Sequence, residues 1–443
     1  MKKITKTTFA VLASLFIFST VSSASPPMRL SLSQALEIAK SENPQVRQAR
    51  IAVSKAEAQI GEAYASALPS VSVSGLYQRN IILQEMLVEI PGSGSQIFKF
   101  QQDNFFNSQI ELSQPLYAAG KLGKALQIAK LYRKVSEEQV ISTWAEVKLL
   151  VTQLYFGAVL AQEWEKTAEE TYRQMEAHQR KVEDMYEQGM VSEYDLIRGQ
   201  VQVTNFYPQV INSQNASKIS VERLIIVLGL PKDQQIDLTD DIFEYDVEEY
   251  KIDNYFSLAA ANRSEIKQLD LQADIFKKLL TIEQHGIRWP NIFLIGGYSY
   301  QAQEPDLDVG DYFWMKNLYA GVSLSIPLFD GFRAKHRADQ VRADMVLLEL
   351  NRETLLKNIN LEIIEARDKL REALKNINAQ VEGVKLAKKG LNIAEVQYEN
   401  GLATQLEVMD AQIALNQARM NELYARFDAV TARAELEKAL AVE

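Results

Sequence analysis

The sequence predicts a mostly α-helical chain with a few membrane-type β-strands, built as two copies of one unit. Three observations lead to this fold class. Motifs recur at a constant offset of 212 residues, the hydrophobic period changes from helical to alternating and back within each copy, and only 19 Gly and 11 Pro interrupt 443 residues. Each unit is expected to be a very long helical hairpin with two strands at one end.

The duplication organises the whole chain. The matched positions are Tyr186 with Tyr398, Gly189 with Gly401 and Pro115 with Pro327, all 212 residues apart, and Pro69 with Pro290, 221 apart. The larger offset indicates a longer insertion between the prolines of the first copy. We expect a first repeat at 25–230, an acidic linker at 231–256 and a second repeat at 257–443.

The helical segments have recognisable ends. Residues 31–66 have a helical apolar pattern that Pro44 should break or bend. Residues 333–398 contain no proline, and a heptad seam runs along them through Leu370, Ile377, Val384, Leu391 and Tyr398. Gly189 and Gly401 are expected to end the long helices, and Ser192 and Thr404 to cap the helices that return.

Four segments alternate between apolar and polar residues, as strands with one apolar face do. They begin near residues 70, 108, 292 and 318. The Pro91–Ser95 stretch between the first two strands contains Pro, Gly and Ser only, and it lacks the lysine of a phosphate loop. It is expected to be a flexible surface loop.

The N-terminus has the pattern of a secretory signal. Three lysines precede the apolar residues 9–18, and small residues lead to a cleavage position after Ala24. We therefore expect a signal peptide at 1–24. No later stretch reads as a membrane-spanning helix, so the exported chain is not expected to cross a bilayer as helices.

Composition excludes several classes of function. The net charge of -10 makes nucleic acid an unsuitable partner, and the lack of cysteine rules out disulfides and thiolate metal sites. The 3 histidines are scattered, with no second ligand at metal spacing. Neither a metal nor another cofactor is expected, and no nucleophile–base pair indicates an enzyme.

Four strands leave open edges and cannot close a membrane barrel, which needs about eight or more. Oligomerisation would remove the edges if each chain contributed its strands to a shared barrel, with the helical hairpins extending from it as a second tube. A purely structural coiled-coil envelope protein is the alternative from another class. The alternating segments count against it, because a structural rod has no use for lipid-facing strands.

The chain resembles the TolC-type outer-membrane efflux proteins. The resemblance rests on Leu32, Ala35 and Leu36 followed by Asn43-Pro44, on Leu68-Pro69-Ser70, on Pro115-Leu116-Tyr117 with Gly120, on Pro327-Leu328-Phe329-Asp330-Gly331, and on the two Tyr-x-x-Gly turns. It implies a homotrimer in which a twelve-stranded outer-membrane β-barrel continues into a periplasmic α-barrel. The implied function is the exit duct of a tripartite efflux system that exports small molecules such as drugs.

The resemblance also implies a gate at the periplasmic tip. By position, Asp195 and Tyr398 belong to the contacts between helices that hold the tip closed, and Glu407 and Asp410 to acidic rings that face the lumen. In a trimer, the three acids would bring nine carboxylates to one constriction, which favours cations. Ala403 departs from the arginine that some members carry there. Read without the resemblance, these acids are ordinary solvated residues on helix surfaces.

The two helical turns are the expected docking site for a periplasmic adaptor protein. Their residues are Gly189, Met190, Val191 and Ser192 in the first turn and Gly401, Leu402, Ala403 and Thr404 in the second. Further implied partners are outer-membrane lipid and an inner-membrane pump of RND, ABC or MFS type. Type I protein secretion and metal-ion efflux share this architecture and stay open as alternatives.

Overall fold

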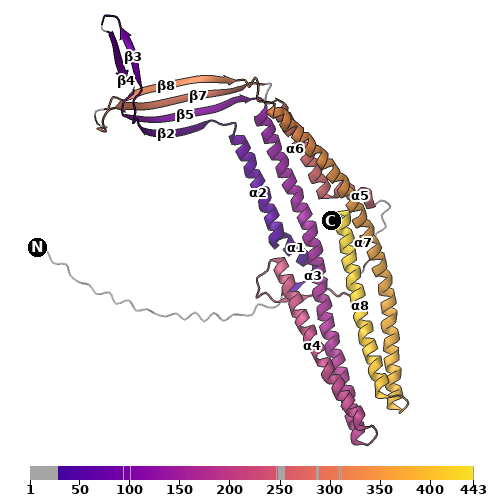
Figure 1. Ribbon diagram of the computed structural model, residues 1–443. Helices are drawn as coiled ribbons and strands as arrows, with labels where there is room; N and C mark the ends of the chain where they lie inside the picture. Colours follow the sequence, from indigo (N-terminus) through magenta and orange to yellow (C-terminus); the bar gives the residue numbers. More distant parts are fainter. Residues whose placement is uncertain are drawn as a thin grey trace, which may run out of the picture.

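The computed structural model describes residues 28–92, 94–99, 101–245, 247, 255–285, 289–308, 310 and 312–442, so the predicted signal peptide lies outside the described residues. The molecule is strongly elongated (Figure 1). Long helices lie side by side, a β-sheet projects from one end of them, and two helical turns form the other end.

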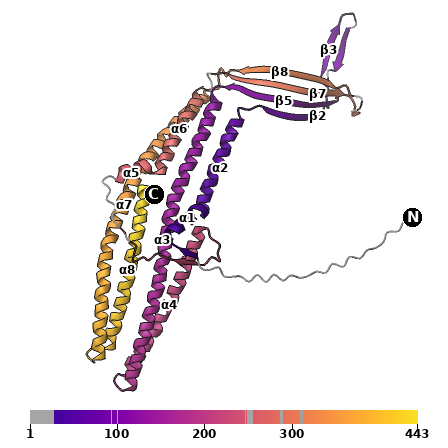
Figure 2. The same ribbon diagram turned by 180° about the vertical axis from the view of Figure 1, so that it is seen from behind.

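The two predicted helical hairpins are confirmed, and their lengths are identical. Helices α3 (Lys121–Glu187) and α7 (Arg333–Glu399) have 67 residues each, and the return helices α4 (Glu193–Leu228) and α8 (Gln405–Leu440) have 36 each. At about 1.5 Å per residue, each of the long helices spans about 100 Å. The chain ends beside the middle of the bundle, because α8 returns only about half the length of α7 (Figure 2).

A shorter helix pair precedes the sheet in each repeat. The predicted break at Pro44 is confirmed, since α1 (Leu32–Glu42) ends there and α2 (Pro44–Ala65) begins. Asn43 accepts hydrogen bonds from the backbone N–H of Gln45 at 2.8 Å and of Val46 at 3.2 Å, which caps α2. The second-repeat counterparts are α5 (Tyr255–Asn262) and α6 (Ser264–His285).

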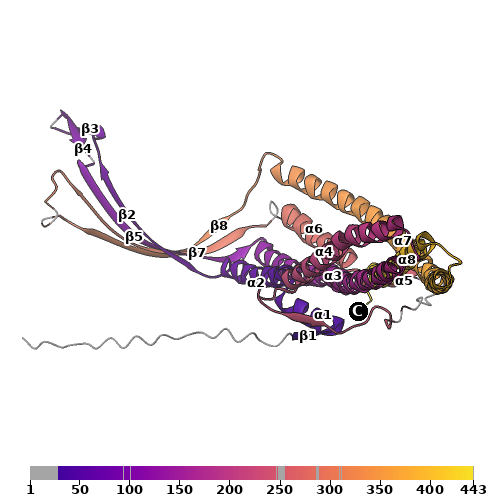
Figure 3. The same cartoon turned by 90° about the horizontal axis from the view of Figure 1, so that it is seen from below.

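One antiparallel sheet contains all four predicted strands. They are β2 (Ser70–Arg79), β5 (Asn104–Ala118), β7 (Asn291–Glu304) and β8 (Met315–Ser325), in the order β2-β5-β7-β8. The central pair, β5 and β7, joins the two repeats. Seen along the bundle, the strands sweep away from the helices in a curve (Figure 3).

Strand β5 is longer than the sequence predicts. It starts at Asn104 and continues past Pro115, where the pairing with β7 shifts register between Pro115 and Tyr117. A proline donates no ladder hydrogen bond, so the prediction ended before it. An irregularity in the pairing accommodates Pro115 within the strand.

The loop expected at Pro91–Ser95 is wrong in part, because Pro91 and Gly92 form the turn of a hairpin whereas Gly94 and Ser95 belong to its second strand. Strands β3 (Glu85–Ile90) and β4 (Gly94–Lys99) pair in antiparallel fashion and project beyond the sheet (Figure 1). Gly92 and Gly94 have φ values of 89° and 78°. Positive φ at these positions allows the tight reversal that a hairpin needs.

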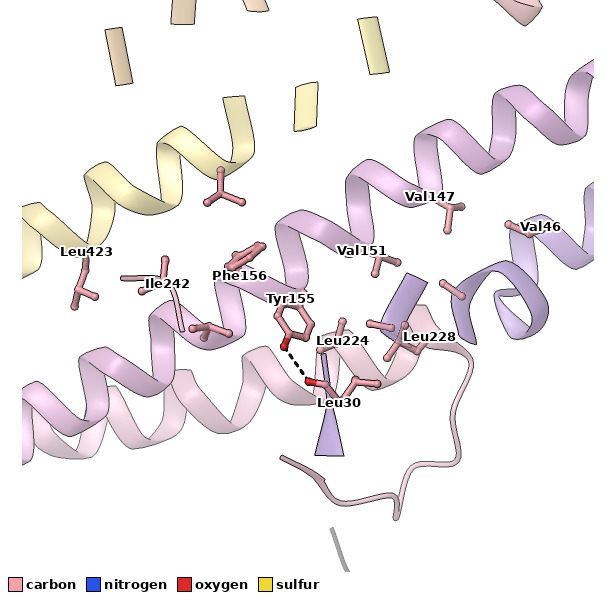
Figure 4. Packing of buried hydrophobic residues seen from close by; sticks show 14 residues of the cluster. Leu30, Val46, Val147, Val151, Tyr155, Phe156, Leu224, Leu228, Ile242 and Leu423 are labelled. Atoms are coloured by element: carbon pink, nitrogen blue, oxygen red, sulfur yellow. Dashed lines mark hydrogen bonds between the residues drawn. The ribbon is translucent and has the colours of Figure 1, made fainter. Parts of the chain in front are cut away.

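The main core lies halfway along α3 and includes the linker between the repeats. Strand β1 (Met28–Leu30) pairs in parallel with β6 (Ile236–Leu238), which belongs to the linker. The buried Tyr155 hydroxyl donates to the carbonyl of Leu30 at 2.9 Å (Figure 4). It also accepts from the N–H of Asp240 at 3.3 Å. Burial strongly raises the pKa of Tyr155. This tyrosine therefore anchors the N-terminal strand and the linker to the middle of the bundle.

One apolar stretch was missed in the sequence. An 18-residue window of α3 reaches a mean hydropathy of 1.2, which meets the length and composition of a membrane-spanning helix. Of that window, 44% is buried inside the structure. The core takes Tyr155 and Phe156 from the same helix, both with 0% exposure. Packing within the bundle therefore accounts for part of the apolar character of α3.

Candidate functional site

The two helical turns share one backbone geometry. Gly189 and Gly401 have φ values of 73° and 74°. In the first turn, Gly189 N donates to Tyr186 O at 2.9 Å and Met190 N to Met185 O at 2.8 Å. The second turn repeats these bonds, from Gly401 N to Tyr398 O at 2.9 Å and from Leu402 N to Gln397 O at 2.8 Å. This is the Schellman termination, whose left-handed residue favours glycine.

Each turn presents one apolar side chain to solvent and directs the next inward. Met190 is 61% exposed and Leu402 is 80% exposed. Val191 and Ala403, which follow them, are half-buried against a cluster that contains Val182. The end of the molecule therefore displays two exposed apolar side chains on rigid backbone turns, which suits a docking surface.

Two of the predicted gate acids have a local structural role that the sequence analysis did not assign. Asp195 Oδ2 accepts hydrogen bonds from Ser192 Oγ at 2.7 Å and from Ser192 N at 3.3 Å, and Ser192 Oγ accepts one from Asp195 N at 3.2 Å. At the equivalent position, Thr404 N donates to Glu407 Oε2 at 2.7 Å. These are capping boxes that begin α4 and α8. The carboxylates also lie where the helix dipole favours negative charge.

Tyr398 is buried between the hairpins. It is 9% exposed, packs in a cluster with Val182 and Val408, and lies with its ring centroid 5.5 Å from that of His178. Its hydroxyl has no hydrogen-bond partner among the described residues. Burial and the negative charge of Asp195 raise the pKa of Tyr398. The structure thus brings Asp195 close enough to act on Tyr398, without a hydrogen bond between them.

Asp410, the third predicted acid, lies on an exposed helix face together with Glu407. Both side chains are exposed and are three positions apart on α8, so they lie on the same side of that helix. Across the hairpins, Lys181 Nζ on α3 lies 3.1 Å from Glu399 Oε1 on α7. This pair is exposed on both sides, so its contribution to stability is small.

The structure also reveals a buried polar side chain that sequence reasoning missed. Gln405 is 3% exposed, and neither its amide oxygen nor its amide nitrogen has a partner among the described residues. A small cavity there is lined in part by His178, Gln179 and Gly199. A Cβ added at Gly199 would lie 1.8 Å from Gln179 Oε1, so α4 approaches α3 closely at this glycine. No sequence spacing links residues of α3 and α8 that lie more than 200 positions apart.

Known proteins resemble this chain in sequence and in fold. The family profile described as "Outer membrane efflux protein" matches residues 35–230 and 255–442. The outer membrane protein TolC of Vibrio cholerae is 21% identical over 349 residues, which is 77% of each chain. CusC is 20% identical, with a TM-score of 0.73 over 92% of this chain and 91% of its own.

The outer membrane channel MtrE of Neisseria gonorrhoeae, solved in an open state, is 15% identical, with a TM-score of 0.73 over 92% of this chain and 88% of its own. These likenesses confirm the predicted fold class. The prediction that the chain is not an enzyme is confirmed by the family match, because the matched proteins are channels. Since the profile covers both repeats, the chain belongs to the outer membrane efflux protein family.

Proposed function

We propose that this protein is the outer-membrane exit duct of a tripartite efflux system, and that it works as a homotrimer. In this arrangement the sheets of three chains close a twelve-stranded barrel in the outer membrane. The helical hairpins form a tunnel through the periplasm that ends at the two turns. An adaptor protein and an inner-membrane pump deliver the substrate to that end.

The observation that carries this proposal is a row of apolar side chains across the sheet. Val73 pairs with Ile110, Ile110 with Tyr298, and Tyr298 with Leu318, one residue from each strand. Their exposures are 71%, 46%, 39% and 78%, in that order. Apolar side chains that line one face of a sheet without protein cover suit contact with lipid.

The neighbouring row is polar on every strand. Ser74 pairs with Gln109, Gln109 with Ser299, and Ser299 with Asn317. Successive residues point to opposite faces of a strand, so one face of the sheet suits lipid and the other suits a water-filled channel. Among the described residues, the outer strands β2 and β8 each pair with one strand only, and pairing with adjacent copies would satisfy their free backbone groups.

The tip is the proposed gate. Tyr398 packed between the hairpins, with Asp195 beside it, supports a closed state held by contacts between α3, α4 and α7. Glu407 and Asp410 on one side of α8 would add to a ring of nine carboxylates in the trimer, which would favour cations. The exposed Met190 and Leu402 support docking of the adaptor on the turns.

The proposed cargo is small molecules, including drugs, in line with the efflux proteins of the family. Protein secretion and metal-ion efflux through the same architecture are the alternatives, since the choice depends on the pump. The structural-rod alternative is disfavoured by the apolar row, which a coiled coil in water would leave exposed.

The lipid-facing row can be tested with two adjacent residues of β8. Leu318→Arg places a charge on the apolar row, whereas Asn317→Arg places the same charge at nearly the same depth on the polar row. A charge facing lipid costs up to about 2–4 kcal/mol at mid-membrane, and one facing the lumen costs little. We expect Leu318→Arg to remove the protein from the outer-membrane fraction and to abolish conductance in planar bilayers, while Asn317→Arg inserts and conducts. Equal insertion of the two variants would contradict the proposal.

A further inference from the structure

Four polar side chains meet where the two hairpins touch near the tip. His178 and Gln179 come from α3, Tyr398 from α7 and Gln405 from α8. We call these four residues the tip seam. Five of the nine buried side-chain polar atoms that lack a hydrogen-bond partner in the described part of the chain belong to them. They are His178 Nε2, Gln179 Oε1, Tyr398 Oη, and Gln405 Oε1 and Nε2.

The packed state leaves too little room for water to pair with all five unpaired polar atoms of the tip seam. The cavity beside it has a volume of about 10 Å³, which is room for about one water molecule. Gly199 brings α4 so close that a Cβ there would collide with Gln179 and would lie 2.8 Å from Gln405 Nε2. The seam is therefore tightly packed but poorly hydrogen-bonded, and separation of the hairpins would give its polar atoms access to water.

The first-repeat core shows the contrasting case. Tyr155 is fully buried, yet its hydroxyl donates one hydrogen bond and accepts another. Asn43, at 3% exposure, uses both its amide oxygen and its amide nitrogen. A fold that satisfies these groups and leaves the tip seam unsatisfied has a point of weakness between its hairpins.

His178 has no counter-ion within the seam. The charge on its own helix that acts on it is Lys181, which is positive and pairs with Glu399 of α7. Helix α8 lines the cavity with uncharged residues only, namely Gln405, Met409 and Gln412. From α4, the charge of Asp195 acts on Tyr398, and this carboxylate is already hydrogen-bonded to Ser192. Burial and the charge of Lys181 lower the pKa of His178.

We propose that the tip seam is a proton-operated latch, in which neutral His178 holds the α7/α8 hairpin against α3 and protonation of its Nε2 releases it. The ring is half-buried but its Nε2 is fully buried, so protonation would place an N–H donor where the described residues offer no acceptor, and release exposes it to water. This inference rests on the proposed gate. It adds the proton as a regulator that acts at His178 on α3, whereas the predicted acidic ring comes from α4 and α8.

The direction of the pH dependence depends on which state, open or closed, binds the proton on His178 more tightly. The open tip exposes His178, with an ordinary pKa of about 6.5, whereas the closed tip lowers it. Closure is therefore fully stable above about pH 6.5 and weakens as the pH falls from there to the lower pKa of the closed state. Within that window, the ratio of open to closed protomers rises by up to about tenfold per pH unit.

The test combines a distance with a conductance. The chain has no cysteine, so Met190→Cys and Leu402→Cys place two nitroxide labels on the exposed apices of the turns. Double electron–electron resonance measures the distance between the two labels from pH 7.5 to pH 5. The trimers are assembled from labelled chain diluted with unlabelled chain. Single-channel conductance is recorded over the same range. We expect the distance between the apices to lengthen and the conductance to rise at low pH. His178→Gln and His178→Phe, which cannot titrate, should abolish both responses.

Each outcome has a distinct meaning. A pH response that persists unchanged in both variants, or a distance that does not respond to pH in the unsubstituted protein, overturns the latch even if the channel conducts. A distance that follows the protonation of His178 in a protein that never conducts would support the latch and contradict the exit duct.

Discussion

The long helical hairpins of the two repeats have the same helix lengths and turns but differ in the side chains that hold them. Helices of 67 and 36 residues occur in both, and their ends correspond at the offset of 212 residues. The turns repeat the same Schellman bonds, and Asp195 and Glu407 close the same capping box. Duplication has retained what the backbone requires at helix ends.

The two repeats differ in the side chain that binds a carbonyl at the C-terminal end of the return helix, a contact that we call the clamp. In the first repeat, Asn43 Nδ2 donates to the carbonyl of Val227 at 2.6 Å, at the end of α4. In the second, Arg263 Nη1 donates at 3.3 Å to Ala439, which corresponds to Val227 in the repeat. The same orphan carbonyl of a helix end is satisfied by an amide in one copy and a guanidinium in the other.

The largest expected effect on stability comes from removing these two clamps, and the two losses should differ in size. Arg263 is 6% exposed and also forms ion pairs with Glu265 at 3.2 Å and Glu362 at 2.9 Å. Arg263→Ala removes both ion pairs, leaves Glu362 with only the longer pair to Lys438 at 4.0 Å, and should cost about 3 kcal/mol. Asn43→Ala removes a cap and one further hydrogen bond and should cost about 2 kcal/mol. Thermal unfolding of the purified protein, followed by far-ultraviolet circular dichroism, measures both.

Arg263→Met is the matched control, because it keeps much of the buried volume and removes only the charge and the donors. It should melt between the wild-type protein and Arg263→Ala. A larger loss from Asn43→Ala than from Arg263→Ala would show that the ion pairs contribute nothing to this clamp.

The turns should respond alike, which sharpens the comparison. Gly189→Ala and Gly401→Ala force a Cβ into left-handed backbone with nothing within 4 Å of it, so the cost is conformational only. About 1–2 kcal/mol is expected at each turn, with Asn costing less than Ala. Comparison of melting temperatures for the two single variants tests the symmetry. Costs that differ by more than about 1 kcal/mol would indicate that one turn is held by contacts outside the backbone.

The smallest effects distinguish capping from gating. Ser192→Ala should cost about 1 kcal/mol through lost capping and leave ion selectivity unchanged. Asp195→Asn keeps an oxygen that can accept from Ser192 and should alter stability by about 0.5 kcal/mol. Combined with Glu407→Gln and Asp410→Asn, it should reduce the preference of the channel for cations, measured as a shift in reversal potential. Selectivity that survives the triple substitution would leave these acids with capping and solvation only.

Much of the fold was predictable because its signals are local. The glycines that end α3 and α7 and the proline that starts α2 act through their own backbone, so those boundaries agree with the structure. The β3/β4 hairpin was missed because its strands have six residues each and flank a stretch typical of a loop. The predicted second strand stopped before Pro115 and was therefore too short. The irregularity that accommodates this proline in β5 depends on pairing with β7.

The candidate site likewise combines residues with local roles, which were predictable, and residues that depend on contacts between helices, which were not. Gly189, Gly401, Ser192 and Thr404 were assigned from their local roles, which the structure confirms. The tip seam was not predicted, since it depends on contacts between helices whose relative rotation no sequence period specifies. His178 appeared in the sequence only as one of three scattered histidines.

The central claim is that three copies of this chain share one barrel and one helical tunnel. Single-particle images of the full-length protein, purified from membranes in mild detergent, test it most directly. We predict a three-fold symmetric tube with about 100 Å of helical tunnel and a barrel about 30–40 Å tall. A two-chain rod, or a compact particle absent from the membrane fraction, would contradict the account.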